Sequence, residues 1–242
     1  MKIKRYFSPN FNPEKRSKSS IKIIVIHYTG MQSEIESLYK LSDFKSKVSC
    51  HYFINRKGLI YRLIDDKFIA WHAGQSCWGF FNNINKHSLG IELVNKGHQF
   101  GYNKFTKKQI HKLSILCKTL IKKYKISKTN VVGHSDIAPT RKVDPGEKFP
   151  WNDLYKKKIG IWHNLDSKTL RILRRKEINE KKEKIEFIKN LKKIGYCVHQ
   201  GNDKIVLKLV VKSFQRRFRK EVINGSIDRE CAAIASNLAK KL

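Results

Sequence analysis

Two histidines and one aspartate occupy positions from which side chains could hold a metal ion. His27 follows the β-branched run 21–26 (IKIIVI), and His134 follows the short apolar run 130–133 (NVVG). Side chains at the end of a buried strand project from a rigid sheet into the loops above it. Asp144 lies in a loop that flanking prolines stiffen. Two histidines and a carboxylate, with one position left open for water, make a ligand set suited to hydrolytic zinc sites.

Lys142 and Glu92 could supply the other groups that metal-assisted hydrolysis needs. Lys142 is two residues from Asp144 in an extended loop, so both side chains can point to one side. Its ammonium group could stabilise negative charge on the oxygen of a scissile carbonyl. Glu92 lies between Ile91 and Leu93 in an apolar strand, so its side chain points to the face of the sheet opposite theirs. There it could relay a proton from water to the leaving group.

Each of these residues, taken singly, also has a simpler interpretation. A histidine at a strand end is more often a hydrogen-bonded structural residue, and an aspartate before proline is more often a turn former. A lysine in a lysine-rich chain and a glutamate on a strand are more often simply solvated. The case for a site therefore depends on all five residues meeting in the fold.

The elements that must position these residues alternate between strands and helices. Runs rich in β-branched residues predict strands, and apolar residues at helical spacing predict helices. The predicted strands are 21–26, 50–54, 59–64, 89–94 and 130–133, and the predicted helices are 33–44 and 106–124, the latter capped by Thr106. This order predicts an α/β fold in which helices flank a mixed β-sheet.

The composition changes near residue 165. Residues 166–180 are highly charged with few large apolar side chains, which predicts a linker or a solvated helix. Beyond them, three groups of apolar residues predict three short helices around a small core. The predicted organisation is a catalytic domain over 1–165, a charged linker over 166–180 and a helical domain over 181–242.

The net charge of +32 is the strongest compositional feature. Such a field attracts polyanions, among them nucleic acids, acidic lipids and wall polymers. The same net charge would arise in a chain whose composition is simply rich in lysine, without selection for binding any partner. A nucleic-acid binder is disfavoured, because the basic run 216–219 (RRFR) and the charged stretch before it come without a base-reading motif.

The cysteines and the apolar runs indicate whether the chain forms disulfides, crosses a membrane or is exported. The five cysteines are widely spaced without a CxxC pair, and we expect them to be small buried hydrophobic residues. No run approaches the roughly 20 apolar residues that cross a bilayer, and the first residues lack the apolar core of a secretory signal. An export segment removed from the mature form would leave the same sequence, so the compartment stays open.

Five segments occur in an order that is typical of one enzyme family: VIHYTG, SCHYFI, WHAG, SLGIELVN and GHSDIAPTRKVDPGEKFPW. They resemble the zinc-dependent N-acetylmuramoyl-L-alanine amidases of the AmpD and AmiD type, the amidase type 2 family, over about residues 21 to 162. The resemblance implies the family's mixed sheet with helices on its faces. By motif, it implies zinc ligands at His27, His134 and Asp144, a catalytic carboxylate at Glu92, an oxyanion-stabilising cation at Lys142, and substrate contacts at Trp71 and His72. Val94 stands where family members often carry a second acid, so no role for that acid carries over.

The C-terminal segment, from FIKNLKKIGY onward, is similar to a three-helix peptidoglycan-binding module, although this match is weaker. An amidase followed by such a module resembles the envelope-facing AmiD branch. The resemblance implies a monomer that needs Zn²⁺ and no organic cofactor, and that hydrolyses the amide bond between N-acetylmuramic acid, or its anhydro form, and L-alanine of peptidoglycan or a muropeptide. It favours the periplasm or cell envelope as the compartment, with the cytoplasm as the alternative. The alternative is a non-catalytic peptidoglycan-recognition protein on the same fold, which the filled ligand positions disfavour.

Overall fold

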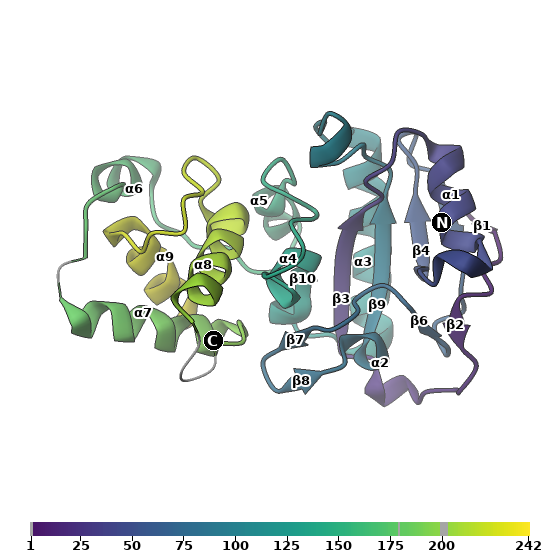
Figure 1. Cartoon of the computed structure of the whole chain (residues 1–242), viewed down its shortest axis with the longest axis horizontal. Helices are drawn as coiled ribbons and strands as arrows, with labels where there is room; N and C mark the ends of the chain where they lie inside the picture. Colours follow the sequence, from purple (N-terminus) through teal and green to yellow (C-terminus); the bar gives the residue numbers. More distant parts are fainter. Residues whose placement is uncertain (1, 179, 199–202) are drawn as a thin grey trace.

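A six-stranded mixed sheet organises the N-terminal two thirds of the chain in the computed structural model, which describes residues 2–178, 180–198 and 203–242 (Figure 1). Strands β4, β9, β3 and β10 run parallel to one another, whereas β5 is antiparallel to β4 and parallel to β1. In sheet order the strands are β1 (Ile3–Arg5), β5 (Ile60–Arg62), β4 (Tyr52–Ile54), β9 (Ser88–Leu93), β3 (Ile23–Tyr28) and β10 (Val131–Gly133). The predicted mixed sheet flanked by helices is confirmed.

The alternation of side chains along β3 separates two hydrophobic cores. Ile24 and Ile26 pack on the face that α3 (Lys107–Tyr124) covers, while Ile23 and Val25 belong to a cluster on the opposite face. Thr106 caps α3 as predicted, because its hydroxyl accepts the backbone N–H of Gln109. The two faces of β3 are therefore both buried, which explains its unbroken apolar run.

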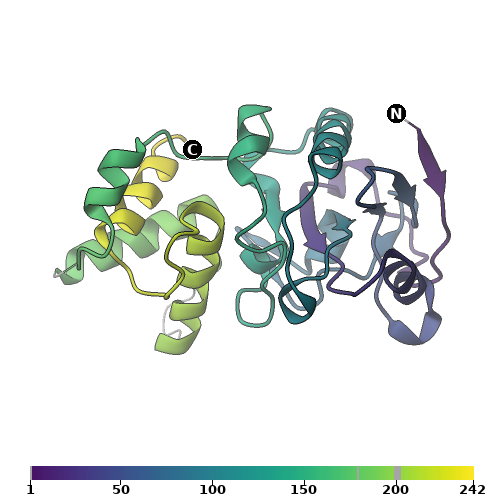
Figure 2. The same ribbon diagram turned by 90° about the horizontal axis from the view of Figure 1, so that it is seen from above.

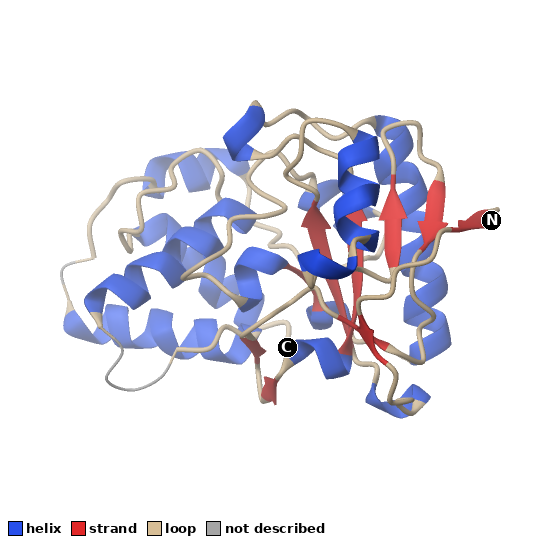
Figure 3. Ribbon diagram, turned by 45° about the vertical axis from the view of Figure 1, so that its right-hand side comes forward, coloured by secondary structure: helices blue, strands red, loops and turns tan. Residues whose placement is uncertain are grey.

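Short helices and loops surround the sheet on both faces and at its ends (Figure 3). Helix α1 (Glu34–Ser42) begins at Ser33, which forms a capping box with Glu36. The remaining elements of this part are β2 (Phe11–Asn12), β6 (Ile69–Ala70), β7 (Cys77–Trp78), β8 (Phe81–Asn82), α2 (Ile84–His87), α4 (His134–Ile137), α5 (Trp151–Lys156) and the 3₁₀ turns Lys18–Ser20, Phe44–Ser46, His98–Phe100 and Lys128–Asn130.

The predicted strand 21–26 is displaced by two residues in the structure. Strand β3 ends at Tyr28, so His27 lies inside the strand and not after it. Pairing with β9 continues through His27 opposite Glu92, because ladder hydrogen bonds need backbone groups and not apolar side chains. Likewise His134 is the first residue of α4 and not a loop residue.

The C-terminal helices form a second lobe beside β10 and α4 (Figures 1 and 2). The lobe consists of α6 (Ser167–Leu173), α7 (Lys181–Ile194), α8 (Lys204–Phe218) and α9 (Arg229–Ala239). Helix α6 lies within the stretch 166–180 and buries Leu170 in the core of the lobe, while most of the other described residues of this stretch are exposed. None of the helices in the described ranges is long and apolar enough to cross a membrane.

One hydrophobic cluster joins the lobe to the sheet. Phe187 and Phe214 of the lobe belong to the same buried cluster as Val25 and Val132 of the sheet. A shared core of this kind stabilises the contact between the two parts, since separating them would expose apolar surface.

A buried ion pair crosses the same boundary. The Arg217 guanidinium of α8 donates to Asp136 of α4 at 2.7 Å and to the Val131 carbonyl at 3.0 Å. The other oxygen of Asp136 accepts the Tyr196 hydroxyl at 2.7 Å, and Ser213 donates to the Ser135 carbonyl. The short helix α4 is therefore attached to the lobe by several hydrogen bonds.

The cysteine prediction holds for three residues and fails for two. Cys50, Cys117 and Cys231 are buried and free, as expected. Cys77 of β7 and Cys197 after α7 form a disulfide between the two parts of the chain. The two cysteines are 120 positions apart in the sequence, so no local pattern predicts their pairing.

Candidate metal centre

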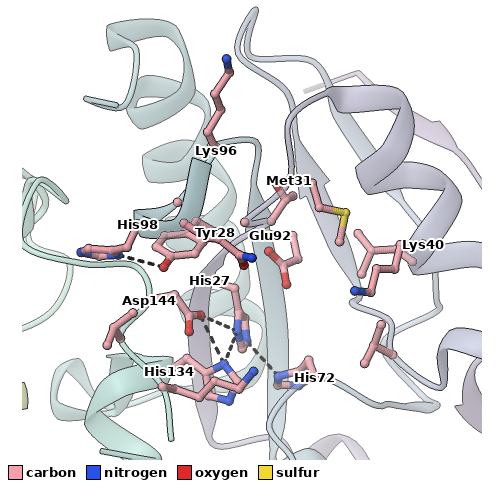
Figure 4. Close-up of a pocket in the computed structure, with 18 of the residues that line it drawn as sticks. His27, Tyr28, Met31, Lys40, His72, Glu92, Lys96, His98, His134 and Asp144 are labelled. Carbon is pink, nitrogen blue, oxygen red and sulfur yellow. Dashed lines mark hydrogen bonds and ion pairs between the residues drawn. The ribbon is translucent and has the colours of Figure 1, made fainter. Parts of the chain in front are cut away.

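Three predicted ligands meet at the end of the sheet, although they come from a strand, a short helix and a loop. His27 Nδ1 lies 2.9 Å from His134 Nδ1 and 3.1 Å from Asp144 Oδ2, and His134 Nδ1 lies 3.2 Å from the same oxygen (Figure 4). All three residues are buried, and their ligand atoms lie within 4.8 Å of one another. The Ser135 N–H donates to the Asp144 carbonyl at 2.8 Å, which fixes the loop against α4.

The hydrogen bond of His134 leaves its Nδ1 lone pair free. Its Nε2 lies 3.1 Å from the Ala73 carbonyl, which can only accept, so Nε2 carries the proton. In a neutral ring Nδ1 is then unprotonated and faces the other two ligands. This is the arrangement in which a backbone carbonyl orients a metal-binding histidine.

A longer chain of hydrogen bonds leaves the Nδ1 lone pair of His27 free in the same way. The Ser88 hydroxyl donates to the Ile84 carbonyl at 2.6 Å, so its oxygen is left to accept from His72 Nε2 at 3.2 Å. His72 Nδ1 is then an acceptor, and it lies 3.1 Å from His27 Nε2, which must donate. The Ile84 carbonyl cannot donate, so it fixes the direction of every hydrogen bond in this chain. With the proton on Nε2, a neutral His27 ring has its Nδ1 lone pair free.

Gly90 makes room for His72 in this chain. A Cβ atom at Gly90 would lie 2.5 Å from His72 Cγ, closer than real Cβ contacts allow. The residue is thus a glycine because the imidazole ring lies directly against the backbone of β9. Sequence reasoning assigned His72 to the substrate groove; the ring borders the cavity, but it is 8% exposed and its polar contacts are with His27 and Ser88.

The electrostatics of the cluster favour a bound cation. Burial, together with the electrostatic influence of the neighbouring His134, lowers the pKa of His27 to about 4. Burial alone would raise the pKa of Asp144, but its contacts with His134 and His27 hold that pKa well below its usual range. Two neutral imidazoles and an ionised carboxylate are the donor set that a divalent zinc ion requires.

Glu92 points from the neighbouring strand into the same space (Figure 4). Burial raises its pKa to about 8, and the negative charge of Asp144 adds to the rise while Lys142 opposes it. Its Oε2 atom is buried without a hydrogen-bond partner among the described residues. A buried carboxylate oxygen that borders a cavity and has no protein partner is available to a bound water or substrate.

The five residues border one cavity of about 370 Å³. Lys142 and Trp71 line it, as the sequence predicts, beside the three ligands and Glu92. Several lining residues escaped sequence reasoning, because a loop lysine or an aromatic carries no signal of its position until the fold is known. These are Tyr28, Met31, Lys40, Lys96, His98 and Arg141.

Comparisons with known proteins agree on one family. The model of the family described as N-acetylmuramoyl-L-alanine amidase matches residues 17–147. The chain is 36% identical over 233 residues to N-acetylmuramoyl-L-alanine amidase AmiD of Escherichia coli, covering 91% of this chain and 83% of that protein. It is 33% identical over 162 residues to 1,6-anhydro-N-acetylmuramyl-L-alanine amidase AmpD of Haemophilus influenzae, covering 60% of this chain and 85% of that protein.

Solved structures give the same result. The E. coli AmiD structure, a complex with anhydro-N-acetylmuramic acid-L-Ala-D-γ-Glu-L-Lys, superposes with a TM-score of 0.80 at 34% identity, covering 92% of this chain and 90% of that one. AmpDh3 from Pseudomonas aeruginosa matches with a TM-score of 0.80 at 31% identity, covering 95% of this chain and 94% of that one. Both matches extend over the C-terminal lobe as well as the sheet, because they cover more than nine tenths of the chain.

Proposed function

The chain belongs to the N-acetylmuramoyl-L-alanine amidase family, and we propose that it hydrolyses the amide bond between N-acetylmuramic acid, or its anhydro form, and L-alanine of the peptidoglycan stem peptide. The observation that carries this proposal is the meeting of His27, His134 and Asp144 beside Glu92 in one cavity. A recognition protein without activity would not need this complete set of donors and a free carboxylate.

We propose zinc as the metal that the three ligands hold. The converging atoms are two imidazole nitrogens and one carboxylate oxygen, each oriented by a further hydrogen bond or by burial. When bound there, zinc supplies a Lewis acid that polarises the scissile carbonyl and makes water a better nucleophile at neutral pH.

Glu92 and Lys142 carry the remaining steps in this proposal. The Glu92 carboxylate takes a proton from the attacking water and delivers it to the leaving nitrogen of L-alanine, so the stem peptide departs as an amine. The Lys142 ammonium stabilises the negative charge that develops on the carbonyl oxygen. Trp71 lines the same cavity and offers an aromatic face to a sugar ring or the peptide.

We propose that the C-terminal lobe binds peptidoglycan and that the protein works in the periplasm or cell envelope. The full-length similarity to AmiD supports this assignment over a single-domain cytoplasmic amidase. The Cys77–Cys197 disulfide agrees with it, since such bonds persist in oxidising compartments.

Release of free stem peptide tests the reaction itself. The purified protein is incubated with muropeptides, with and without a chelator, and the products are weighed by mass spectrometry. We expect stem peptide to appear without the chelator, to vanish with it, and to return when Zn²⁺ is added back. Release that is indifferent to chelation would contradict the metal mechanism, and no release under any condition would contradict the reaction.

Replacing His72 with phenylalanine tests the hydrogen-bond chain. The variant removes the acceptor for His27 Nε2, so we expect zinc affinity to fall by roughly 10- to 100-fold, as measured by competition with a chromogenic chelator. His111→Phe, on the exposed side of α3, is the matched control and should change nothing. An increase in KM with unchanged zinc affinity would instead assign His72 to substrate binding.

A further inference from the structure

A second cavity of about 660 Å³ lies between α3, α5 and the end of α8, and we call it the lysine cleft. Its volume lies within the range of ligand sites. Phe105, Ile110 and Pro150 provide apolar lining. Six lysines surround them: Lys104, Lys107, Lys148, Lys156, Lys157 and Lys220.

The positive charge of the lysine cleft is largely uncompensated. Among the described residues, only Lys148 of the six has an ammonium group in a hydrogen bond, ion pair or cation–π contact, namely with the carbonyl and ring of Tyr102. Two acidic residues line the cleft. Glu147 already faces His98 at 3.0 Å and Arg216 at 3.9 Å, so Asp153 is the acidic lining residue that remains to balance the lysines. A concave surface with one sign of charge concentrates ligands of the opposite charge.

The lysine cleft adjoins the catalytic cavity. His98 lines the catalytic cavity and Glu147 lines the cleft, and these two side chains are hydrogen bonded to each other. The catalytic part supplies five of the lysines, and Lys220 comes from the loop that follows α8 in the C-terminal lobe. A polymer that enters both spaces would therefore contact both parts of the protein.

We propose that the lysine cleft binds carboxylate groups of polymeric peptidoglycan beyond the muramyl residue that is being cut. This inference rests on the proposed function, because it assumes peptidoglycan in the neighbouring cavity. Stem peptides carry free carboxylates, and flexible ammonium groups suit them as point charges. No arginine is among the described lining residues of the cleft, and its one aromatic lining residue, Phe105, is half-buried against the hydrophobic core. Nucleic-acid sites typically use arginine forks and several exposed aromatic rings.

The test compares two triple variants with the same change in net charge. The cleft variant is Lys107→Gln, Lys156→Gln and Lys220→Gln; the control is Lys4→Gln, Lys118→Gln and Lys122→Gln, all exposed and outside both cavities. Co-sedimentation with insoluble peptidoglycan measures binding at several salt concentrations. We expect roughly tenfold weaker binding and a reduced salt dependence for the cleft variant, since three exposed ion pairs are lost.

Hydrolysis separates this inference from the proposed function. The cleft variant should cut a soluble monomeric muropeptide within about twofold of the wild-type rate, and intact peptidoglycan more slowly. Equal weakening in both variants, or none in either, would overturn the inference. Loss of duplex-DNA binding with peptidoglycan binding intact would overturn it in favour of nucleic acid. Failure of the wild-type protein to cut muropeptide would contradict the proposed function, while sedimentation would still report on the cleft.

Discussion

Glu92→Gln should lower kcat for muropeptide hydrolysis by roughly 10²- to 10⁴-fold while zinc remains bound. The substitution keeps the shape of the side chain and removes its ability to accept and deliver a proton. Glu92 is not among the three converging ligands, so the metal should be retained. Rates come from single-turnover release of stem peptide, and zinc content from elemental analysis of the same samples.

The distribution of the loss between kcat and KM decides what Glu92 does. A proton-transfer role predicts a fall in kcat at nearly constant KM. A variant that loses zinc in proportion to its activity would show that Glu92 supports the metal and not the proton transfer. Lys142→Met provides the comparison. It should lower kcat because it removes the charge that stabilises the developing oxyanion, while the proton carrier Glu92 stays in place.

Much of the site follows from sequence because its residues sit on strongly patterned elements. The alternation around Glu92 places it on the face of β9 opposite Ile91, which packs towards α3. The ordered motifs then bring His27 and His134 together across the parallel neighbours β3 and β10. Local periodicity thus predicted the mixed sheet, whereas the grouping of the five residues followed from the resemblance of the ordered motifs to one family.

Long-range contacts between side chains account for what the sequence could not predict. Ser88 determines the tautomer of His27 through His72, but a serine at the start of a strand gives no sign of that role. The same holds for Arg217, which reads as one more basic residue in RRFR and is instead buried against Asp136. Such pairings depend on how the lobe packs, which neither composition nor periodicity encodes.

Arg217→Met should lower the free energy of unfolding by about 3–5 kcal/mol, because it leaves the Asp136 carboxylate buried without its cation. Urea unfolding followed by tryptophan fluorescence measures the change. Lys189→Met on α7 is the control: its side chain is 78% exposed and its contact with Glu186 is a surface pair, so the loss should stay below about 1 kcal/mol.

A double variant distinguishes the charge from the packing of Arg217. Asp136→Asn combined with Arg217→Met neutralises the abandoned carboxylate while an amide can still meet Gly133 and Tyr196, so part of the stability should return. If the double variant is as unstable as the sum of the two single changes, the pair carries no specific coupling. Because α4 begins at the ligand His134 and Asp136 attaches it to the lobe, we expect the metal centre and the lobe of the wild-type protein to unfold in a single transition.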